Sequence, residues 1–346
     1  GEISYAGLAE LHHSSSGLPS HLALIRSALS IGDLDPGENA LSKVTTGIAP
    51  ASYHCLSCFA VYGIGVNLEG ILAVCSMTRE QAASTVRQWQ CLSLAHVAGD
   101  LWAVPSGIRR SLLEALIPQE RREANRAAGG FLRDLAEAGR AAELGLSRLD
   151  LLIEARGHYL DADDLDSAAS VTARISGYLR RRGHHRELIR MNREILDRQP
   201  QSASSIAWIA QGHLDLGEHR KAAEWYSRAI QISSDPAFYH GLGLALLGGT
   251  KLDRAKDALE KAVDAYRGSG DLSGEAACLG KQAEIDLKMG EQGSAILRLE
   301  RVMEIMRLLG DQSGEAAVLQ EVARLEMAGG KHDSARGRIV RSLALL

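Results

Sequence analysis

Apolar positions in the C-terminal half of the chain follow a pattern that repeats every 40 residues. Residues 270–295 and 310–335 both begin Gly-Asp-x-Ser-Gly-Glu-Ala-Ala, and a Leu and an Ala follow at matching places. The apolar residues of each stretch are spaced three or four apart, as on one face of an α-helix. Gly290 or Gly330 then precedes a second apolar stretch. The pattern predicts helix pairs joined by short glycine-containing turns.

Small residues mark the second helix of each predicted pair. Positions i, i+4 and i+7 share one helix face, and a small first residue lets two antiparallel helices approach closely. These triples are Ala222/Tyr226/Ala229, Ala255/Leu259/Ala262, Ala295/Leu299/Val302 and Ala335/Ile339/Ser342. Over residues 145–346 the pattern resembles tetratricopeptide repeats, although the spacing of the last repeats is longer than the usual length of about 34 residues.

The resemblance implies that the pairs stack into a superhelix whose concave surface binds a protein or peptide. The repeat register turns certain positions on the first helix of each pair towards that surface. These predicted partner-binding residues are Gln211, Asp215, His240, Leu244, Lys281, Glu284, Lys288, Gln320 and Arg324. The alternative is that the solenoid is merely a spacer.

In the N-terminal third of the chain the apolar residues are spaced differently. Short helices are expected at 51–63, 67–75 and 78–93, and residues 94–104 alternate around Gly99-Asp100 as a small hairpin would. Three helices and a hairpin predict a winged-helix domain at 41–110 with a β wing. A helical stretch is expected from Ile108, with a connector at 111–145. The expected fold class is therefore all-α, with an α-solenoid of tetratricopeptide-like helix pairs at 146–346.

A winged helix followed by repeats resembles the C-terminal part of STAND-type signalling ATPases, which are NB-ARC-like. In that class a Gly-Leu-Pro-Leu motif precedes the winged helix, and here Gly-Leu-Pro-Ser occupies residues 17–20, within a segment (1–40) that would end a helical lid. The resemblance implies that Gly17, Leu18 and Pro19 lie near a nucleotide. The family's phosphate-sensing histidine would fall at residues 104–106, which read Val-Pro-Ser with Pro105 in the centre. The absence of that histidine argues against nucleotide sensing by this domain.

Catalytic motifs are missing from the sequence. It contains no G-x-x-x-x-G-K-[ST] phosphate-binding loop and neither G-x-S-x-G nor H-E-x-x-H. We therefore expect this chain to be no enzyme and to hold no cofactor, with ATP or ADP confined to a longer parent protein.

The resemblance implies that the repeats bind a protein or peptide trigger and so control oligomerisation of the parent's ATPase core. The competing hypothesis is a scaffold or transcription-regulator fragment that recruits protein partners without a nucleotide switch. A hydrolase is the least favoured class.

Composition and charge narrow the class of protein and its expected location. With 45% hydrophobic and 24% charged residues the chain is a typical folded protein, and its net charge of −4 gives no general attraction to nucleic acid. No apolar run reaches the roughly 18 residues that a membrane span needs, and we expect residues 1–5 not to begin a signal peptide, because they have no basic or apolar segment of that kind. Five cysteines at scattered positions favour a reducing, cytoplasmic location.

The strongest basic cluster consists of Arg180, Arg181, Arg182 and Arg186. Basic residues at a helix C-terminus complement the helix dipole, so a solvated helix end is preferred over a site for an acidic partner or nucleic acid. The third helix of the predicted winged helix carries few cations, which argues against DNA binding by this helix.

Two further clusters could bind a metal. His54, Cys55 and Cys58 could form half of a metal site, but no second such group completes it, so core packing is preferred. The carboxylates at 161–164 are expected to be solvated or to cap a helix.

Overall fold

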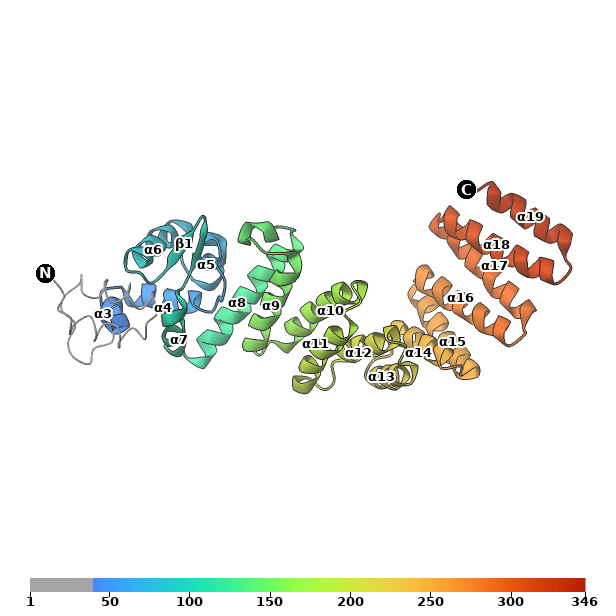
Figure 1. The fold of residues 1–346 in the computed structure, drawn as a ribbon, viewed down its shortest axis with the longest axis horizontal. Coiled ribbons are helices and arrows are strands. Elements are labelled where there is room, and N and C mark those ends of the chain that lie inside the picture. Colours follow the sequence, from blue (N-terminus) through green and yellow to red (C-terminus); the bar gives the residue numbers. More distant parts are fainter. Residues whose placement is uncertain (1–39, 346) are drawn as a thin grey trace. The chain divides into compact units, whose positions relative to one another are not determined.

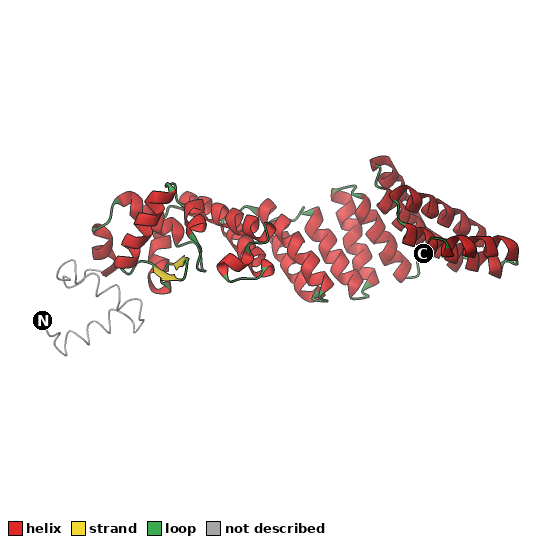
Figure 2. Cartoon of the chain, turned by 90° about the horizontal axis from the view of Figure 1, so that it is seen from above, coloured by secondary structure: helices red, strands yellow, loops and turns green. Residues whose placement is uncertain are grey.

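The computed structural model describes residues 40–345, which belong to two compact units. The division lies between Ile175 and Ser176, inside helix α10 (Leu165–Arg181). The predicted all-α fold class is confirmed, because the described residues form helices, short connections and one two-stranded hairpin (Figures 1 and 2). Across residues 40–345, no helix has both the length and the apolar character needed to cross a membrane.

Three helices and a hairpin follow α3 (Ala40–Thr46) in the first unit. The helices are α4 (Pro50–Phe59), α5 (Leu68–Val74) and α6 (Arg79–Cys91). Strands β1 (His96–Ala98) and β2 (Leu101–Ala103) pair antiparallel (Figure 2). Val66, just before α5, pairs with Trp102 through backbone hydrogen bonds of 2.9 and 2.8 Å. The three predicted helices and the hairpin are thus present, with ends that differ by a few residues.

Capping side chains set the starts of the second and third of these helices. Asn67 accepts a hydrogen bond from the backbone N–H of Gly70 at the start of α5. Thr78 and Gln81 form a reciprocal capping box at the start of α6. Each cap satisfies backbone donors that have no partner inside the helix, so these local residues fix where the helices begin.

The helical stretch expected from Ile108 is interrupted. Helix α7 (Ser106–Glu114) ends before Pro118, and Pro118 begins α8 (Pro118–Glu137). Proline lacks an N–H and disfavours helical geometry in the residue before it, and Ile117 accordingly has an extended ψ of 154°. The proline therefore turns one predicted helical segment into two helices.

A buried polar pair joins α8 to α9 (Arg148–Asp161). His158 is 6% exposed, and its Nδ1 lies 2.8 Å from Oδ1 of Asn125. The Tyr62 ring packs edge-on against the imidazole, with ring centroids 5.5 Å apart. Burial lowers the pKa of His158 to about 4; nearby Arg109 lowers it further, and Asp161 opposes the shift. The imidazole is therefore neutral in the folded protein at neutral pH.

We expect the first unit to lose stability as the pH falls from about 6.5 to about 4. In that range the unfolded chain takes up a proton on His158 that the folded chain does not, so protons favour unfolding. The loss should approach about 3 kcal/mol, because one pKa unit corresponds to about 1.4 kcal/mol. Urea unfolding of the natural protein and of His158→Gln across this pH range measures it. An equal loss in the variant, which cannot titrate there, would contradict the assignment to His158.

The second unit consists of successive helices that pack in antiparallel pairs. Figure 1 shows α16 to α19 side by side, in line with their mutual contacts. The helices are α11 (His185–Arg198), α12 (Ala203–Asp215), α13 (His219–Ile232), α14 (Pro236–Gly248), α15 (Leu252–Ser269), α16 (Leu272–Lys288), α17 (Gln292–Leu309), α18 (Gln312–Ala328) and α19 (His332–Leu343).

Turn and cap residues recur with the predicted register. Gly290 and Gly330 adopt φ of +81° and +78° in the turns within the last two pairs, a conformation that glycine accepts without strain. Asp271 and Asp311 each accept a hydrogen bond from the backbone N–H three residues later and cap α16 and α18. The 40-residue sequence repeat is therefore also a repeat of backbone conformation.

The predicted small-residue triples form the contacts within the pairs. Ala222, Ala255, Ala295 and Ala335 are all 0% exposed. The other members of the triples are buried as well, with the exception of Ile339, which is 37% exposed on the last helix. The predicted inward face of α19 is thus only partly covered.

Candidate functional site

All nine predicted partner-binding residues lie on first helices of pairs in the second unit. Gln211 and Asp215 are on α12, His240 and Leu244 on α14, the residues of the segment 281–288 on α16, and Gln320 and Arg324 on α18. The positions on α12 differ in their environment from those on α16 and α18, and His240 on α14 is intermediate. The sequence alone did not show this difference.

The α12 positions are held by neighbouring helices. Asp215 accepts a hydrogen bond of 2.7 Å from Arg180 Nε and another of 2.7 Å from Gln211. Its carboxylate also lies 3.5 Å from His185 Nδ1. Gln211 in turn accepts a hydrogen bond from the Tyr226 hydroxyl at 3.0 Å. These side chains therefore link α10, α11, α12 and α13, which is a structural task.

The α16 and α18 positions carry exposed ion pairs. Glu284 lies between Lys281 and Lys288, with N–O distances of 3.0 and 2.9 Å, and the hydrogen bond from Lys288 is the main reason why the pKa of Glu284 is lowered. On α18, Arg324 donates two hydrogen bonds to Glu321. Exposed pairs of this kind contribute about 0–1 kcal/mol, so a partner can replace them at little cost. A partner could therefore bind these side chains without breaking contacts between helices.

His240 lies between these two groups. It is half-buried on α14, and its pKa is lowered first by burial and then by the charge of Lys281 on α16. An imidazole beside a lysine offers a partner both a hydrogen-bonding group and a positive charge.

Buried ion pairs between the repeats were missed by sequence reasoning. Glu275 is 1% exposed and lies 3.1 Å from Arg267 and 3.4 Å from Arg301. Forty residues on, Glu315 pairs with Arg307 and Arg341. The 40-residue offset of all three positions was visible in the sequence and could have revealed this arrangement.

A second buried carboxylate follows the same offset. Asp286 is 0% exposed between Lys256 and Arg298, with N–O distances of 2.8 and 2.7 Å. Its counterpart Glu326 pairs with Arg338, the counterpart of Arg298. Both networks hold a buried carboxylate between basic side chains of neighbouring helices and so link those helices.

The four arginines of the basic cluster have different environments. Arg180 is paired with Asp215, and the guanidinium of Arg181 lies 4.9 Å from the ring centroid of Tyr178. Arg182 and Arg186 are exposed. Arg186 lines an open cavity of about 350 Å³ along α11, together with Arg190, Arg193, Glu194 and Asp197. This mixed lining fits the solvated helix end better than an anion site.

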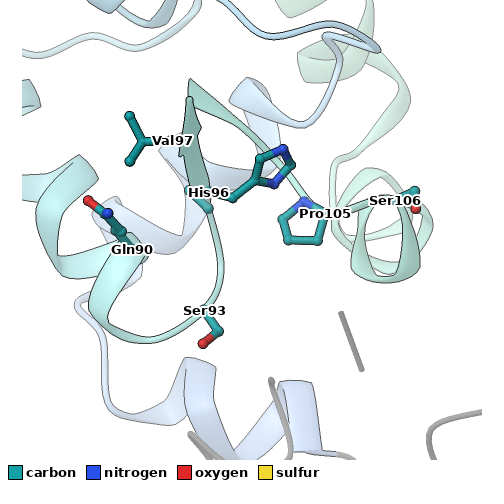
Figure 3. A pocket seen from close by; sticks show the side chains of 7 residues that line it. Gln90, Ser93, His96, Val97, Pro105 and Ser106 are labelled. Atoms are coloured by element: carbon teal, nitrogen blue, oxygen red, sulfur yellow. The ribbon is translucent and has the colours of Figure 1, made fainter. Parts of the chain in front are cut away.

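A second open cavity, of about 530 Å³, lies beside the hairpin (Figure 3). Its lining includes Pro105, at the position where the STAND resemblance would place a histidine, and Ser106. His96 of β1 nevertheless contributes an imidazole to the lining of this cavity, and its side chain points towards Pro105 (Figure 3). The residues Gly17, Leu18 and Pro19, which the resemblance assigns to the nucleotide, lie outside the described residues.

The remaining clusters have structural environments. Asp164 caps α10 by accepting a hydrogen bond from the Ser167 N–H, and it lies 3.4 Å from Arg126. Cys58 is buried, with His54 Nε2 at 3.6 Å from its sulfur. Within residues 40–345, no three His, Cys, Asp or Glu side chains are grouped so that they could hold a metal ion.

Comparison with known proteins identifies the architecture. No protein-family model and no curated protein matches the sequence. A STAND protein with a tetratricopeptide repeat sensor from Pyrococcus horikoshii matches 99% of this chain with 51% of its own, at 16% identity and a TM-score of 0.64. This chain therefore spans about half the length of that protein.

Two further solved structures match about half of the chain. The tetratricopeptide-like repeats of a putative kinesin light chain from Podosopora anserina cover 50% of this chain and 92% of their own, with 17% identity and a TM-score of 0.44. MamA from Desulfovibrio magneticus RS-1 covers 54% and 96%, with 18% identity and a TM-score of 0.43. The likeness to the Pyrococcus protein is one of fold, and by that fold the chain is a tetratricopeptide-like helical repeat protein.

Proposed function

We propose that this chain is the sensor region of a STAND-type signal-transduction ATPase, in which the repeat unit binds a protein or peptide trigger in the cytoplasm. The observation that carries the proposal is the fold similarity to a STAND protein with a repeat sensor, because it extends over both units and not over the repeats alone. ATP or ADP would bind to an ATPase core outside this chain, and that core would be the second partner.

The first unit supports this assignment. Its order of helix, isolated β-bridge at Val66, two helices and hairpin supports a winged helix with a β wing. In the proposed mechanism the trigger binds more tightly to the open arrangement of the parent protein and so shifts its population towards the active form.

The exposed charge pairs of α16 and α18 are the proposed contact surface. Glu284 and Arg324 can exchange their present partners for those of a ligand, whereas Asp215 is held by three side chains within the unit. We therefore place the trigger on α14 to α18 and not on α12.

Site-specific photo-crosslinking tests this placement. A photo-reactive amino acid at exposed Gln320, on α18, should crosslink a protein partner in cells that naturally contain this protein. The same amino acid at Arg220, which is also exposed and lies on the second helix α13, is the matched control and should give no such product. Equal products from both positions, or none from Gln320, would reject this surface.

The parent protein provides a separate test of the nucleotide switch. The coding sequence upstream of Gly1 should encode a phosphate-binding loop, G-x-x-x-x-G-K-[ST]. A complete gene without that loop would exclude the ATPase reading and leave the repeat unit as a scaffold.

A further inference from the structure

Three of the five cysteines gather where α4 meets the end of α5. Cys55 is half-buried on α4, whereas Cys75, directly after α5, is 5% exposed. The Cys75 thiol donates a hydrogen bond of 3.3 Å to the backbone carbonyl oxygen of Cys55, which brings the two cysteines next to each other. An accessible thiol therefore lies directly beside a buried one.

The two thiols differ in acidity. The neighbouring Cys75 thiol lowers the pKa of Cys55 to about 7, while contact with Cys55 and burial raise the pKa of Cys75. Burial also raises the pKa of Cys58, the third thiol, to about 11. At neutral pH the thiolate of this cluster is therefore carried by Cys55, the most accessible of the three.

The other titratable groups around the three cysteines do not change which thiol is the most acidic. On α4, His54 faces Cys58, with Nε2 at 3.6 Å from that sulfur. On α8, Glu120 lies 3.9 Å from the other ring nitrogen of His54, and its charge acts on Cys58. Cys58 is thus kept as a neutral thiol, and Cys75 is the neighbour that Cys55 can bond to.

We propose that Cys55 and Cys75 form a redox-active dithiol, which a low-molecular-weight disulfide oxidises to a covalent bridge between α4 and the end of α5. The Cys55 thiolate attacks one sulfur of the external disulfide and releases one thiolate, leaving a mixed disulfide. Cys75 then loses its proton to that released thiolate and attacks the Cys55 sulfur, which expels the second thiolate. The protein dithiol is oxidised and one external disulfide is reduced to two thiols.

The bridge would close the loop that contains Val66. Cys55 and Cys75 are 20 residues apart, and Val66 between them holds β2 through its two backbone hydrogen bonds. Closing this loop removes conformations from the unfolded chain, so oxidation should raise the unfolding temperature of the first unit.

Incubation of the full chain with glutathione disulfide, followed by alkylation and peptide mapping, tests the proposal. The natural protein and the Cys91→Ser control, which removes an exposed thiol on α6, should both give a Cys55–Cys75 linked peptide. Cys75→Ser should keep a glutathione adduct on Cys55, because no second thiol displaces it. Cys55→Ser should form neither adduct nor bridge at Cys75.

The rate of alkylation shows whether Cys55 reacts because Cys75 lies beside it or only because it is exposed. At pH 7, iodoacetamide should modify Cys55 roughly five-fold faster in the natural protein than in Cys75→Ala, because a larger thiolate fraction outweighs its lower nucleophilicity. Circular dichroism confirms that each variant is folded. A Cys55–Cys58 bridge, a lasting glutathione adduct in the natural protein, or equal alkylation rates would overturn the proposal.

Discussion

Gly241→Ala is expected to lower the free energy of unfolding of the second unit by about 3 kcal/mol, the upper part of the range for overpacked cores. Gly241 lies in the middle of α14, where a Cβ would collide with the ring and hydroxyl of Tyr226 on α13. The ring cannot easily yield, since it is 4% exposed and its hydroxyl donates to Gln211. Urea unfolding followed by circular dichroism measures the loss.

Gly280→Ala is the matched control on α16. No atom lies within 4 Å of the position that its Cβ would take, so the alanine should stabilise the helix by about 0.5–1 kcal/mol. Tyr226→Leu in the Gly241→Ala background should recover part of the loss, because it removes the ring that the new methyl group meets. Similar effects of the two glycine substitutions would show that close packing at Gly241 is not what matters.

Arg298→Met is expected to cost about 3 kcal/mol, because it leaves the carboxylate of Asp286 buried with Lys256 as its remaining ion-pair partner. Arg298 donates to both Asp286 and Gln282, at 2.7 and 2.8 Å, so the substitution also leaves a buried amide oxygen without this donor. The free energy of unfolding, measured by urea denaturation, reports the loss.

Arg324→Met provides the comparison for this second prediction. Arg324 is exposed and paired with Glu321 on its own helix, so its loss should change stability by less than about 0.5 kcal/mol. Replacing both partners, as Asp286→Leu with Arg298→Met, should be less harmful than Arg298→Met alone, because the buried carboxylate is gone and Lys256 keeps its ion pair with Glu291. A double variant that is even less stable would contradict this account.

Local signals explain how much of the fold could be predicted from the sequence. Turn glycines such as Gly290 and cap residues such as Asp271 act on their own neighbourhood, and the apolar spacing of three and four is a property of a single helix. The helix pairs and the hairpin followed from such signals. Pro118 is also a local signal, because it ends one helix and begins the next. The prediction of a single helical stretch did not take it into account.

Contacts between distant residues could not be predicted in the same way. Nothing near His158 in the sequence indicates that Asn125 would satisfy it, since the two meet only when α8 packs on α9. Likewise, the register placed Asp215 on a first helix but could not show that Arg180 would bind it. The candidate surface was therefore found as a set of helix positions, and the structure was needed to separate exchangeable charges from structural ones.

The repeated ion pairs have a consequence for how such a chain can change in length. Glu275 finds both of its partners between Arg267 and Arg301, a span shorter than one repeat, and the same holds for Glu315. A duplicated segment of one repeat length would thus bring its own counter-charges and leave no buried carboxylate alone. We expect natural variants of this chain to gain or lose helix pairs in whole repeats, because any other insertion would separate a carboxylate from its arginines.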